Sequence, residues 1–370
     1  MRILFSGVNA AGHLLPMVPL ADAAADAGHE VAFLTGADAA GYLGDRMLLP
    51  AGPSPDELRR ESERRAGGGD SRHAGEASVT LFTDARIDLG YDESVAQARR
   101  FAPDLLVCEE LDFVGPLVAA ALDVPWAVHA ITAPMPAAFR EPLLARTEAQ
   151  RDARGLRPRP RRVALIDPLP QALRSPADPP PPADRIATRT AAFAGDRNPA
   201  RAVDLPSGRP LVLVTTGTSV REPDLLETLA TSVAKQGYQV VATIETGALP
   251  AIAGVHEIGF VPLARLLPEL DAVVATGGMG TVLAALSAAV PLVLRPVMAD
   301  QPWNARRVAE AGAGLVIDDP TEAGPAVHTV LTEPHYRAAA QAAATAIHST
   351  QTPAAALTEL LAKAGLPTQA

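Results

Sequence analysis

One histidine and one later group of carboxylates are candidates for acid–base chemistry. His13 follows the first apolar run, in AAGHLLP, and a later apolar run, DLLVCEE, ends in Glu109 and Glu110. A histidine can take a proton from a hydroxyl near neutral pH, and a carboxylate orients the imidazole and stabilises its charged form. We therefore predict His13 as a base with Glu109 as its partner. Glu110 and Asp112 are the alternatives, because side chains alternate along a strand, and a loop histidine is also often a solvated or capping residue.

A glycine-rich turn, VVATGGMGTV from Val273, joins an apolar run to a helical pattern. The start of a helix exposes unpaired N–H groups and a positive dipole end, so it can hold a phosphate without a lysine. Gly277 and Gly278 would let an anion approach the backbone, and Thr281 adds a hydroxyl. A tight turn that needs positive φ values is the equal alternative.

Two further polar segments follow apolar runs in the second half. Thr215–Ser219, TTGTS, could hold a second phosphate, although ordinary Ser/Thr turn chemistry explains it almost as well. In MADQPWNARRV, Asp300 and Gln301 are side chains that can bind sugar hydroxyls. Asp300 could instead be a simple N-cap with Pro302 at the first helical position.

The elements that must position these residues alternate between strand and helix in both halves. Residues 2–36 predict a βαβ unit, and a helix over about 85–101 precedes the strand that ends at Glu109. After Pro206 the alternation restarts. Residues 50–80 are polar and glycine-rich, typical of a mobile loop, and the proline-rich segment 155–185 is predicted as loop and linker outside any sheet. The pattern predicts two doubly wound α/β domains with a cleft between them, and ligands at the carboxyl ends of the strands.

Composition limits the function classes. The chain has 370 residues, enough for two domains, and a formal net charge of −10 without a basic block, which argues against nucleic acid. Its single cysteine, Cys108, excludes an internal disulfide framework and a cysteine-based metal cluster. The N-terminal apolar run is too short for a signal peptide and no run suits a membrane span, so a cytoplasmic protein is predicted.

In combination, these motifs resemble the GT-B glycosyltransferases of family 1, especially those that decorate bacterial natural products. The resemblance covers nearly the whole chain and rests on three ordered stretches: GHLLPMVPLADAAADAGHEVAFLTG, GFVPLARLLPELDAVVATGGMGTVLAAL and PLVLRPVMADQPWNARRVAEAGAGL. It implies two Rossmann-like domains. Residues 1–190 would bind the acceptor, 191–206 would link the domains, 207–352 would bind the nucleotide sugar, and a helix in 353–370 would cross back to the first domain.

The resemblance also implies the roles of individual residues. His13 corresponds to the general base and Glu109 to its carboxylate partner, in a direct displacement with inversion at the anomeric carbon and without an essential metal. Phe260 and Val261 match the segment that meets the nucleobase, and Asp300 and Gln301 match the donor-sugar pair. The diphosphate-binding positions are Thr216, Gly217, Thr218, Thr276, Gly277, Gly278, Gly280 and Thr281.

The expected donor is a dTDP-sugar, with a UDP-sugar as the alternative, and the expected acceptor is a small-molecule aglycone. The resemblance also admits a homodimer. One motif departs from the family pattern: Ala275 and Thr276 stand where the family has histidines, and a neutral bond to phosphate in place of a charged one costs about 1–2 kcal/mol. This departure motivates a rival prediction, a catalytically silent binding protein of the same fold. A second rival is a nucleotide-sugar epimerase, which would need no acceptor.

Overall fold

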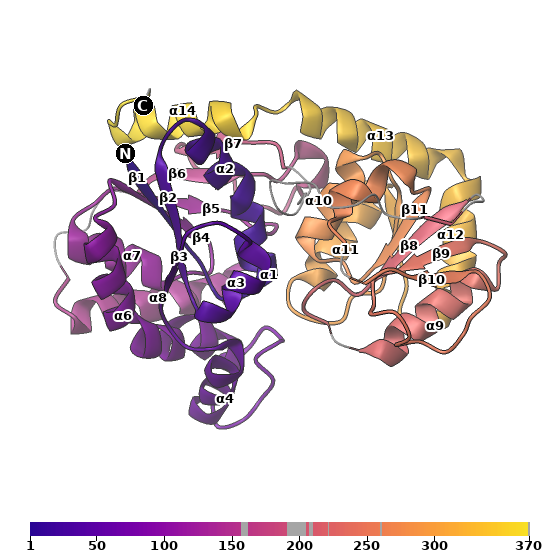
Figure 1. The fold of residues 1–370 in the computed structure, drawn as a ribbon, viewed down its shortest axis with the longest axis horizontal. Coiled ribbons are helices and arrows are strands. Elements are labelled where there is room, and N and C mark those ends of the chain that lie inside the picture. Colours follow the sequence, from indigo (N-terminus) through magenta and orange to yellow (C-terminus); the bar gives the residue numbers. More distant parts are fainter. Residues whose placement is uncertain (157–161, 191–204, 207–209, 221, 260, 369–370) are drawn as a thin grey trace. The chain divides into compact units, whose positions relative to one another are not determined.

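The apolar runs of the first half form one parallel sheet. The computed structural model describes residues 1–156, 162–190, 205–206, 210–220, 222–259 and 261–368. Seven strands lie in the order β3-β2-β1-β4-β5-β6-β7, and each pairing is parallel (Figure 1). The strands are β1 (Arg2–Ser6), β2 (Glu30–Thr35), β3 (Leu48–Pro50), β4 (Leu105–Glu109), β5 (Trp126–His129), β6 (Arg162–Asp167) and β7 (Arg185–Ala187).

A second parallel sheet has the same order at its centre. Six strands lie in the order β10-β9-β8-β11-β12-β13. They are β8 (Leu211–Thr215), β9 (Gln239–Ala242), β10 (Val255–Glu257), β11 (Ala272–Ala275), β12 (Leu292–Leu294) and β13 (Gly314–Val316). The central strands are buried along their whole length, as expected for parallel strands covered on both faces. The two Rossmann-like sheets that the sequence predicts are thus confirmed.

Helices cover both sheets. The compact unit that contains the first sheet also contains α1 (Ala11–Leu14), α2 (Val18–Asp26), α3 (Ala40–Leu43), α4 (Pro55–Arg65), α5 (Glu76–Thr80), α6 (Arg86–Phe101), α7 (Val114–Leu122), α8 (Ala137–Ala153) and α14 (Pro353–Ala364). The unit that contains the second sheet also contains α9 (Pro223–Ala234), α10 (Met279–Ser287), α11 (Gln301–Glu310), α12 (Ala323–Thr332) and α13 (Pro334–Ser349). A π-helical turn, Leu81–Ala85, joins α5 to α6.

Two predictions about irregular segments are wrong in part. The segment 155–185 contains β6, which pairs with β5 and β7 inside the first sheet. Val163, Ala164 and Ile166 are buried there, and the prolines that suggested a linker lie outside the strand. The polar segment 50–80 contains α4 and α5, and Ser54 caps α4 by accepting a hydrogen bond from the N–H of Glu57.

The chain forms two compact units, and each unit is built from more than one stretch of the sequence. The first comprises Met1–Pro168, Pro179–Thr188 and Gln351–Ala370, and the second comprises Leu169–Asp178 and Arg189–Thr350. In the first unit α14 packs against α2 and β6, with Leu357, Leu360 and Leu361 buried in the same apolar cluster as β1 (Figure 1). Of the predicted linker, 191–206, only 205–206 are described.

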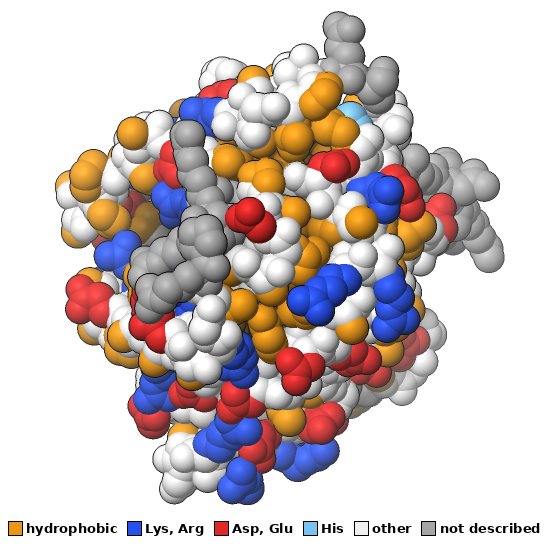
Figure 2. Space-filling model, turned by 90° about the vertical axis from the view of Figure 1, so that its left-hand side faces the viewer, with side chains coloured by type: hydrophobic (Ala, Val, Ile, Leu, Met, Phe, Trp, Pro, Cys, Tyr) orange, Lys and Arg blue, Asp and Glu red, His pale blue; other side chains and the backbone are white. Residues whose placement is uncertain are grey.

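The surface carries mixed charge. Figure 2 shows acidic and basic side chains interspersed over one face, with no large patch of a single sign. Helix α4 illustrates the pattern, since Arg64 and Arg65 both pair with Glu61. Within the described ranges, no helix has the length and apolar character needed to cross a membrane.

Candidate active site

In each sheet, some of the predicted functional residues lie at the point where the strand order reverses. In the first sheet that point is between β1 and β4, with His13 just beyond β1 and Glu109 at the end of β4. In the second sheet it is between β8 and β11. The Thr216–Thr218 turn follows β8, and the glycine turn follows β11. Open α/β sheets bind their ligands at this kind of crevice.

The structure brings His13 and Glu109 together. His13 lies in the single helical turn α1, not in a loop, and its Nδ1 is 2.9 Å from Oε1 of Glu109. The Glu109 side chain is fully buried, whereas 19% of the His13 side chain is exposed. The carboxylate also accepts the N–H of Val8 at 3.2 Å and that of Leu111 at 2.6 Å. A carboxylate held in this way fixes the ring orientation and favours the tautomer that carries its proton on Nδ1.

Close packing places the loop after β1 against Glu109. A Cβ on Gly7 would lie 2.6 Å from Cδ2 of Leu14 and 3.2 Å from Cγ of Glu109, so only glycine fits without a shift. On the other side, the ring of Phe82, from the π-helical turn, has its centroid 5.8 Å from that of His13. The imidazole is therefore bounded by a carboxylate and an aromatic ring.

The two alternative partners of His13 have other contacts. Oε1 of Glu110 accepts the N–H groups of Ile131 at 2.9 Å and Thr132 at 3.0 Å, in the segment after β5. Desolvation raises the pKa of Glu110 to about 8, against the lowering effect of these two bonds. Asp112 forms an ion pair with Arg86, with Oδ1 2.8 Å from Nη2.

In the second unit, a threonine joins the two candidate phosphate turns. Oγ1 of Thr276 donates to the carbonyl of Thr216 at 3.3 Å, so it ties the turn after β11 to the turn after β8. Thr276 is buried, whereas Gly217 and Thr218 are exposed. The N–H of Gly217 donates to Oγ1 of Thr215, the local Ser/Thr turn chemistry that the alternative prediction named.

The three glycines of the turn after β11 differ in what the fold requires. Gly277 has a φ of +93°, and a Cβ there would lie 3.2 Å from the carbonyl of Gln301, so the backbone itself needs glycine. Gly278, with φ −59°, and Gly280 have open space where a Cβ would stand. Gly278 is the N-cap of α10, and no side-chain cap occupies that end. A helix start of this form, with no side chain at its second and third glycines, is the kind of site at which anions bind in other proteins.

The pair Asp300 and Gln301 lies beside the glycine turn. Asp300 occupies the N-cap position of α11, but its side chain caps no helix N–H; instead Oδ2 accepts from Nδ2 of Asn304 at 2.7 Å. Nδ2 of Asn304 also donates to the carbonyl of Gly277 at 3.1 Å. Oε1 of Gln301 accepts the N–H groups of Val297 and Met298. The simple N-cap alternative therefore does not describe Asp300.

The predicted nucleobase segment is described only in part. Phe260 lies outside the described residues, and the half-buried Val261 follows β10.

Among the described residues, no group of three His, Cys, Asp or Glu side chains has an arrangement that could hold a metal ion. Thr281 lies in the first turn of α10 and is half-buried.

The sequence analysis missed several residues around His13. Arg86 and Phe82 both lie in the stretch 81–101, and their spacing gives no signal of a site. The only available signal was an arginine in the buried face of α6, where Ile87 and Gly90 are its neighbours.

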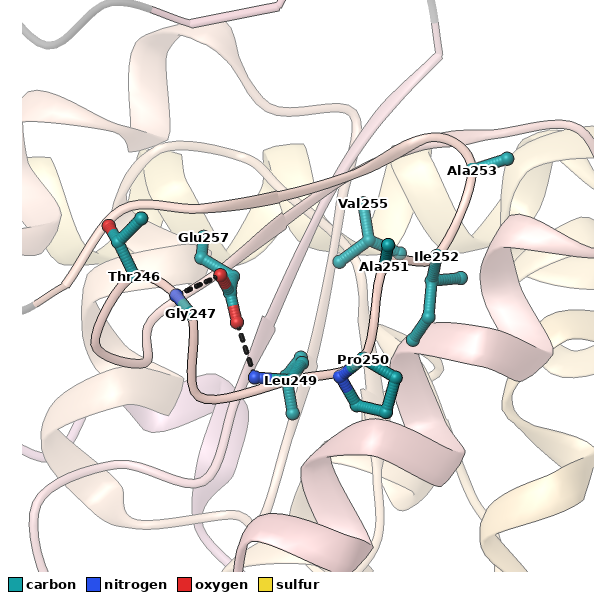
Figure 3. Close-up of a pocket in the computed structure, with 9 residues that line it drawn as sticks. All are labelled: Thr246, Gly247, Leu249, Pro250, Ala251, Ile252, Ala253, Val255 and Glu257. Carbon is teal, nitrogen blue, oxygen red and sulfur yellow. Dashed lines mark hydrogen bonds between the residues drawn. The ribbon is translucent and has the colours of Figure 1, made fainter.

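A cavity of about 510 Å³ lies apart from the predicted residues in the second unit (Figure 3). Residues of the loop after β9 and of β10, between Thr246 and Glu257, line it. The carboxylate of Glu257 closes one side by accepting the N–H groups of Gly247 at 2.5 Å and Leu249 at 2.6 Å. It contains none of the residues that the motifs select.

Comparison with known proteins agrees with this geometry. Residues 74–195 and 227–362 match the N-terminal and C-terminal domains of the family described as erythromycin biosynthesis protein CIII-like. The chain is 30% identical to L-demethylnoviosyl transferase of Streptomyces niveus, over 87% of this chain and 86% of that one. It is 29% identical to the elloramycin glycosyltransferase ElmGT of Streptomyces olivaceus, over 100% and 99% of the two chains.

A solved relative shares the whole architecture. The glycosyltransferase SsfS6 of Streptomyces sp. SF2575, complexed with thymidine diphosphate, superposes with a TM-score of 0.80 at 28% identity, over 96% of this chain and 97% of that one. The GT-B fold predicted from the motifs is therefore confirmed, and the silent binding protein and the epimerase are set aside as rivals. The chain belongs to the erythromycin CIII-like family of natural-product glycosyltransferases, and it is a glycosyltransferase.

Proposed function

We propose that this enzyme transfers a deoxysugar from a dTDP-sugar to a hydroxyl of a natural-product aglycone, with inversion at the anomeric carbon. The acceptor oxygen attacks the anomeric carbon as the bond from that carbon to the diphosphate oxygen breaks. The acceptor proton moves to His13, and the nucleoside diphosphate leaves. The observation that carries the proposal is the 2.9 Å contact between Nδ1 of His13 and a fully buried Glu109 carboxylate.

The geometry of His13 suits a general base. With Nδ1 directed at Glu109, Nε2 is the ring nitrogen that would receive the acceptor proton. The buried carboxylate then stabilises the imidazolium that forms, as in other enzymes that activate a hydroxyl. The aromatic face of Phe82 limits where an acceptor hydroxyl can approach.

The donor diphosphate would bind at the turns after β8 and β11. The N-terminus of α10, bare at Gly278 and Gly280, offers N–H groups and a positive dipole end that stabilise the departing diphosphate. Asp300 and Gln301 would bind the sugar hydroxyls, and Val261 with Phe260 would meet the base. Thymidine diphosphate in SsfS6 supports dTDP as the nucleotide, and UDP is the alternative.

The test is a product assay with His13→Ala. We expect wild-type protein, given a dTDP-deoxysugar and a panel of hydroxylated aglycones, to form a glycoside of inverted anomeric configuration. His13→Ala should reduce turnover by about 10²- to 10⁴-fold, with nearly unchanged affinity for dTDP. His73→Ala, which removes an exposed histidine, is the matched control and should behave as wild type.

Three results would count against the proposal. Full turnover by His13→Ala would remove the histidine from the chemistry. A product of retained configuration would require a two-step mechanism through a covalent intermediate. Parallel loss of turnover and dTDP binding in His13→Ala would point to a structural role for this residue instead.

A further inference from the structure

A buried ion pair contacts the residues that precede the candidate base in the sequence. Arg86, at the start of α6, is 5% exposed, and Asp112, three residues after Glu109, is 2% exposed. Oδ1 of Asp112 accepts from Nη2 of Arg86 at 2.8 Å and from Nε at 3.2 Å. A buried ion pair generally stabilises a fold no better than well-packed apolar residues. The residues that the pair contacts are therefore a better guide to its function than its contribution to stability.

The ion pair forms hydrogen bonds with the segment that precedes His13. Ser6 donates its hydroxyl to Oδ2 of Asp112, and the carbonyl of Gly7 accepts from Nη2 of Arg86 at 2.8 Å. The next residue, Val8, donates its N–H to Glu109. Ser6, at the end of β1, and the two residues that follow it are thus each hydrogen-bonded to Glu109, to Asp112 or to Arg86. These bonds fix the distance between the histidine and its carboxylate.

The two charges of the pair also cancel beside Glu109. Cys108 and Ser6 face the pair from the central strands, and burial raises the pKa of the Cys108 thiol well above its usual range, so the thiol is neutral. Glu110 lies on the β5 side, held by the amides of Ile131 and Thr132. With Asp112 neutralised by Arg86, Glu109 is the carboxylate that acts on the imidazole.

We propose that Arg86 and Asp112 are positioning residues for the catalytic base. They hold the turn that carries His13, and their mutual neutralisation leaves the charge of Glu109 unopposed at the imidazole. The inference rests on the proposed role of His13. It goes beyond that proposal because neither residue touches the dyad side chains directly; they act through the backbone of Gly7 and through their charge.

The experiment compares the pH profile of kcat/KM for three variants of the full-length enzyme. Arg86→Met leaves the Asp112 charge unpaired, so His13 should protonate more readily and the acid limb should move to higher pH. Asp112→Asn leaves the guanidinium unpaired and should move the acid limb to lower pH. Each shift should be about half a unit or more. The double variant should restore the wild-type limb.

The turnover data separate position from charge. All three variants lose a hydrogen bond to Gly7 or to Ser6. We therefore expect kcat to fall by about 10- to 100-fold, even in the double variant, whose acid limb returns to the wild-type pH. KM for the donor should be unchanged. Arg86→Lys should keep the limb at its wild-type pH because it keeps the charge. The matched control is Arg46→Met, which breaks another well-formed pair, Arg46 with Asp22, in the same unit. Arg46→Met should leave the acid limb of the pH profile at its wild-type position.

Opposite shifts that cancel in the double variant would support the inference, and unmoved limbs or shifts in one direction would overturn it. Thermal unfolding and dTDP binding establish that each variant is folded. If Arg86→Met does not fold, Asp112→Asn and the double variant decide the question by the direction and cancellation of their shifts. Full activity of His13→Ala would defeat the proposed function itself, whereas an inactive His13→Ala with unmoved limbs defeats only this inference.

Discussion

Adjacent carboxyl groups at the end of β4 lie in opposite environments. Glu109 points to the β1 side, where His13 and two backbone N–H groups hold its charge. Glu110 points to the β5 side, where desolvation raises its pKa to about 8, with the Glu109 and Asp167 carboxylates adding to the effect. Neighbouring groups with such different environments are typical of sites where one carboxylate must stay ionised.

Glu110 should make the stability of the protein depend on pH. Between its ordinary pKa of 4.5 and about 8, the folded protein keeps a proton on Glu110 that the unfolded chain has released. The free energy of unfolding therefore falls as the pH rises through this range. Glu110→Gln mimics the protonated form, so it should match wild type at pH 5 and be more stable at pH 8.5, by on the order of 1–3 kcal/mol.

Denaturant unfolding at both pH values measures this difference. Glu141→Gln, at an exposed position of α8, is the control and should show equal effects at pH 5 and 8.5. The account of Glu110 is wrong if its variant and wild type differ by the same amount at both pH values.

At the scale of elements, the turns after β8 and β11 act as one unit because Thr276 connects them. The hydroxyl of Thr276 is bonded to the turn that follows β8. We propose that it orders this turn, and that the end of α10 supplies the contacts to phosphate. Asn304 makes a second connection, because its Nδ2 donates both to the carbonyl of Gly277 in the glycine turn and to Asp300.

Thr276→Val should weaken nucleotide binding without unfolding the protein. Valine has nearly the same shape but cannot donate to the Thr216 carbonyl, and one lost hydrogen bond costs about 0.5–1.5 kcal/mol, or roughly 3- to 10-fold in Kd for dTDP. The matched control is Thr228→Val, which removes a hydroxyl that donates to the Asp224 carbonyl in α9. Equal dTDP affinity in Thr276→Val and wild type would show that the two turns do not depend on this bond.

Most of the helices and strands that position the site could be predicted from the sequence, because they depend on local patterns. Apolar runs predicted β1, β4, β8 and β11, and the glycine turn predicted the start of α10. The run RVALID escaped because the prolines around it dominated the interpretation. The contact of Arg86 with Asp112 and Gly7 joins residues 26 and 79 positions apart, and no periodicity encodes such a distance.

At the scale of the whole molecule, the chain connects its two units more than once. Residues Leu169–Asp178 belong to the second unit, where Arg307 of α11 donates to the carbonyl of Leu173 at 3.0 Å and to both carboxylate oxygens of Asp178. This guanidinium lowers the pKa of Asp178. The last helix, α14, belongs to the first unit. It is capped at its start by the Thr352 side chain and ends at Gly365, which has a φ of +70°. Contacts over more than a hundred residues, such as that of Arg307, could not be predicted from local pattern.

Calorimetric titration of the protein with dTDP, UDP and GDP tests the proposed donor site. We expect micromolar binding that is tightest for dTDP and is lost in Gly278→Val. A Cβ at Gly278 meets open space at an ordinary φ, so this substitution should leave the fold intact and block only the approach of an anion to the end of α10. Absence of binding for all three nucleotides, or equal binding by folded Gly278→Val and wild type, would contradict the account.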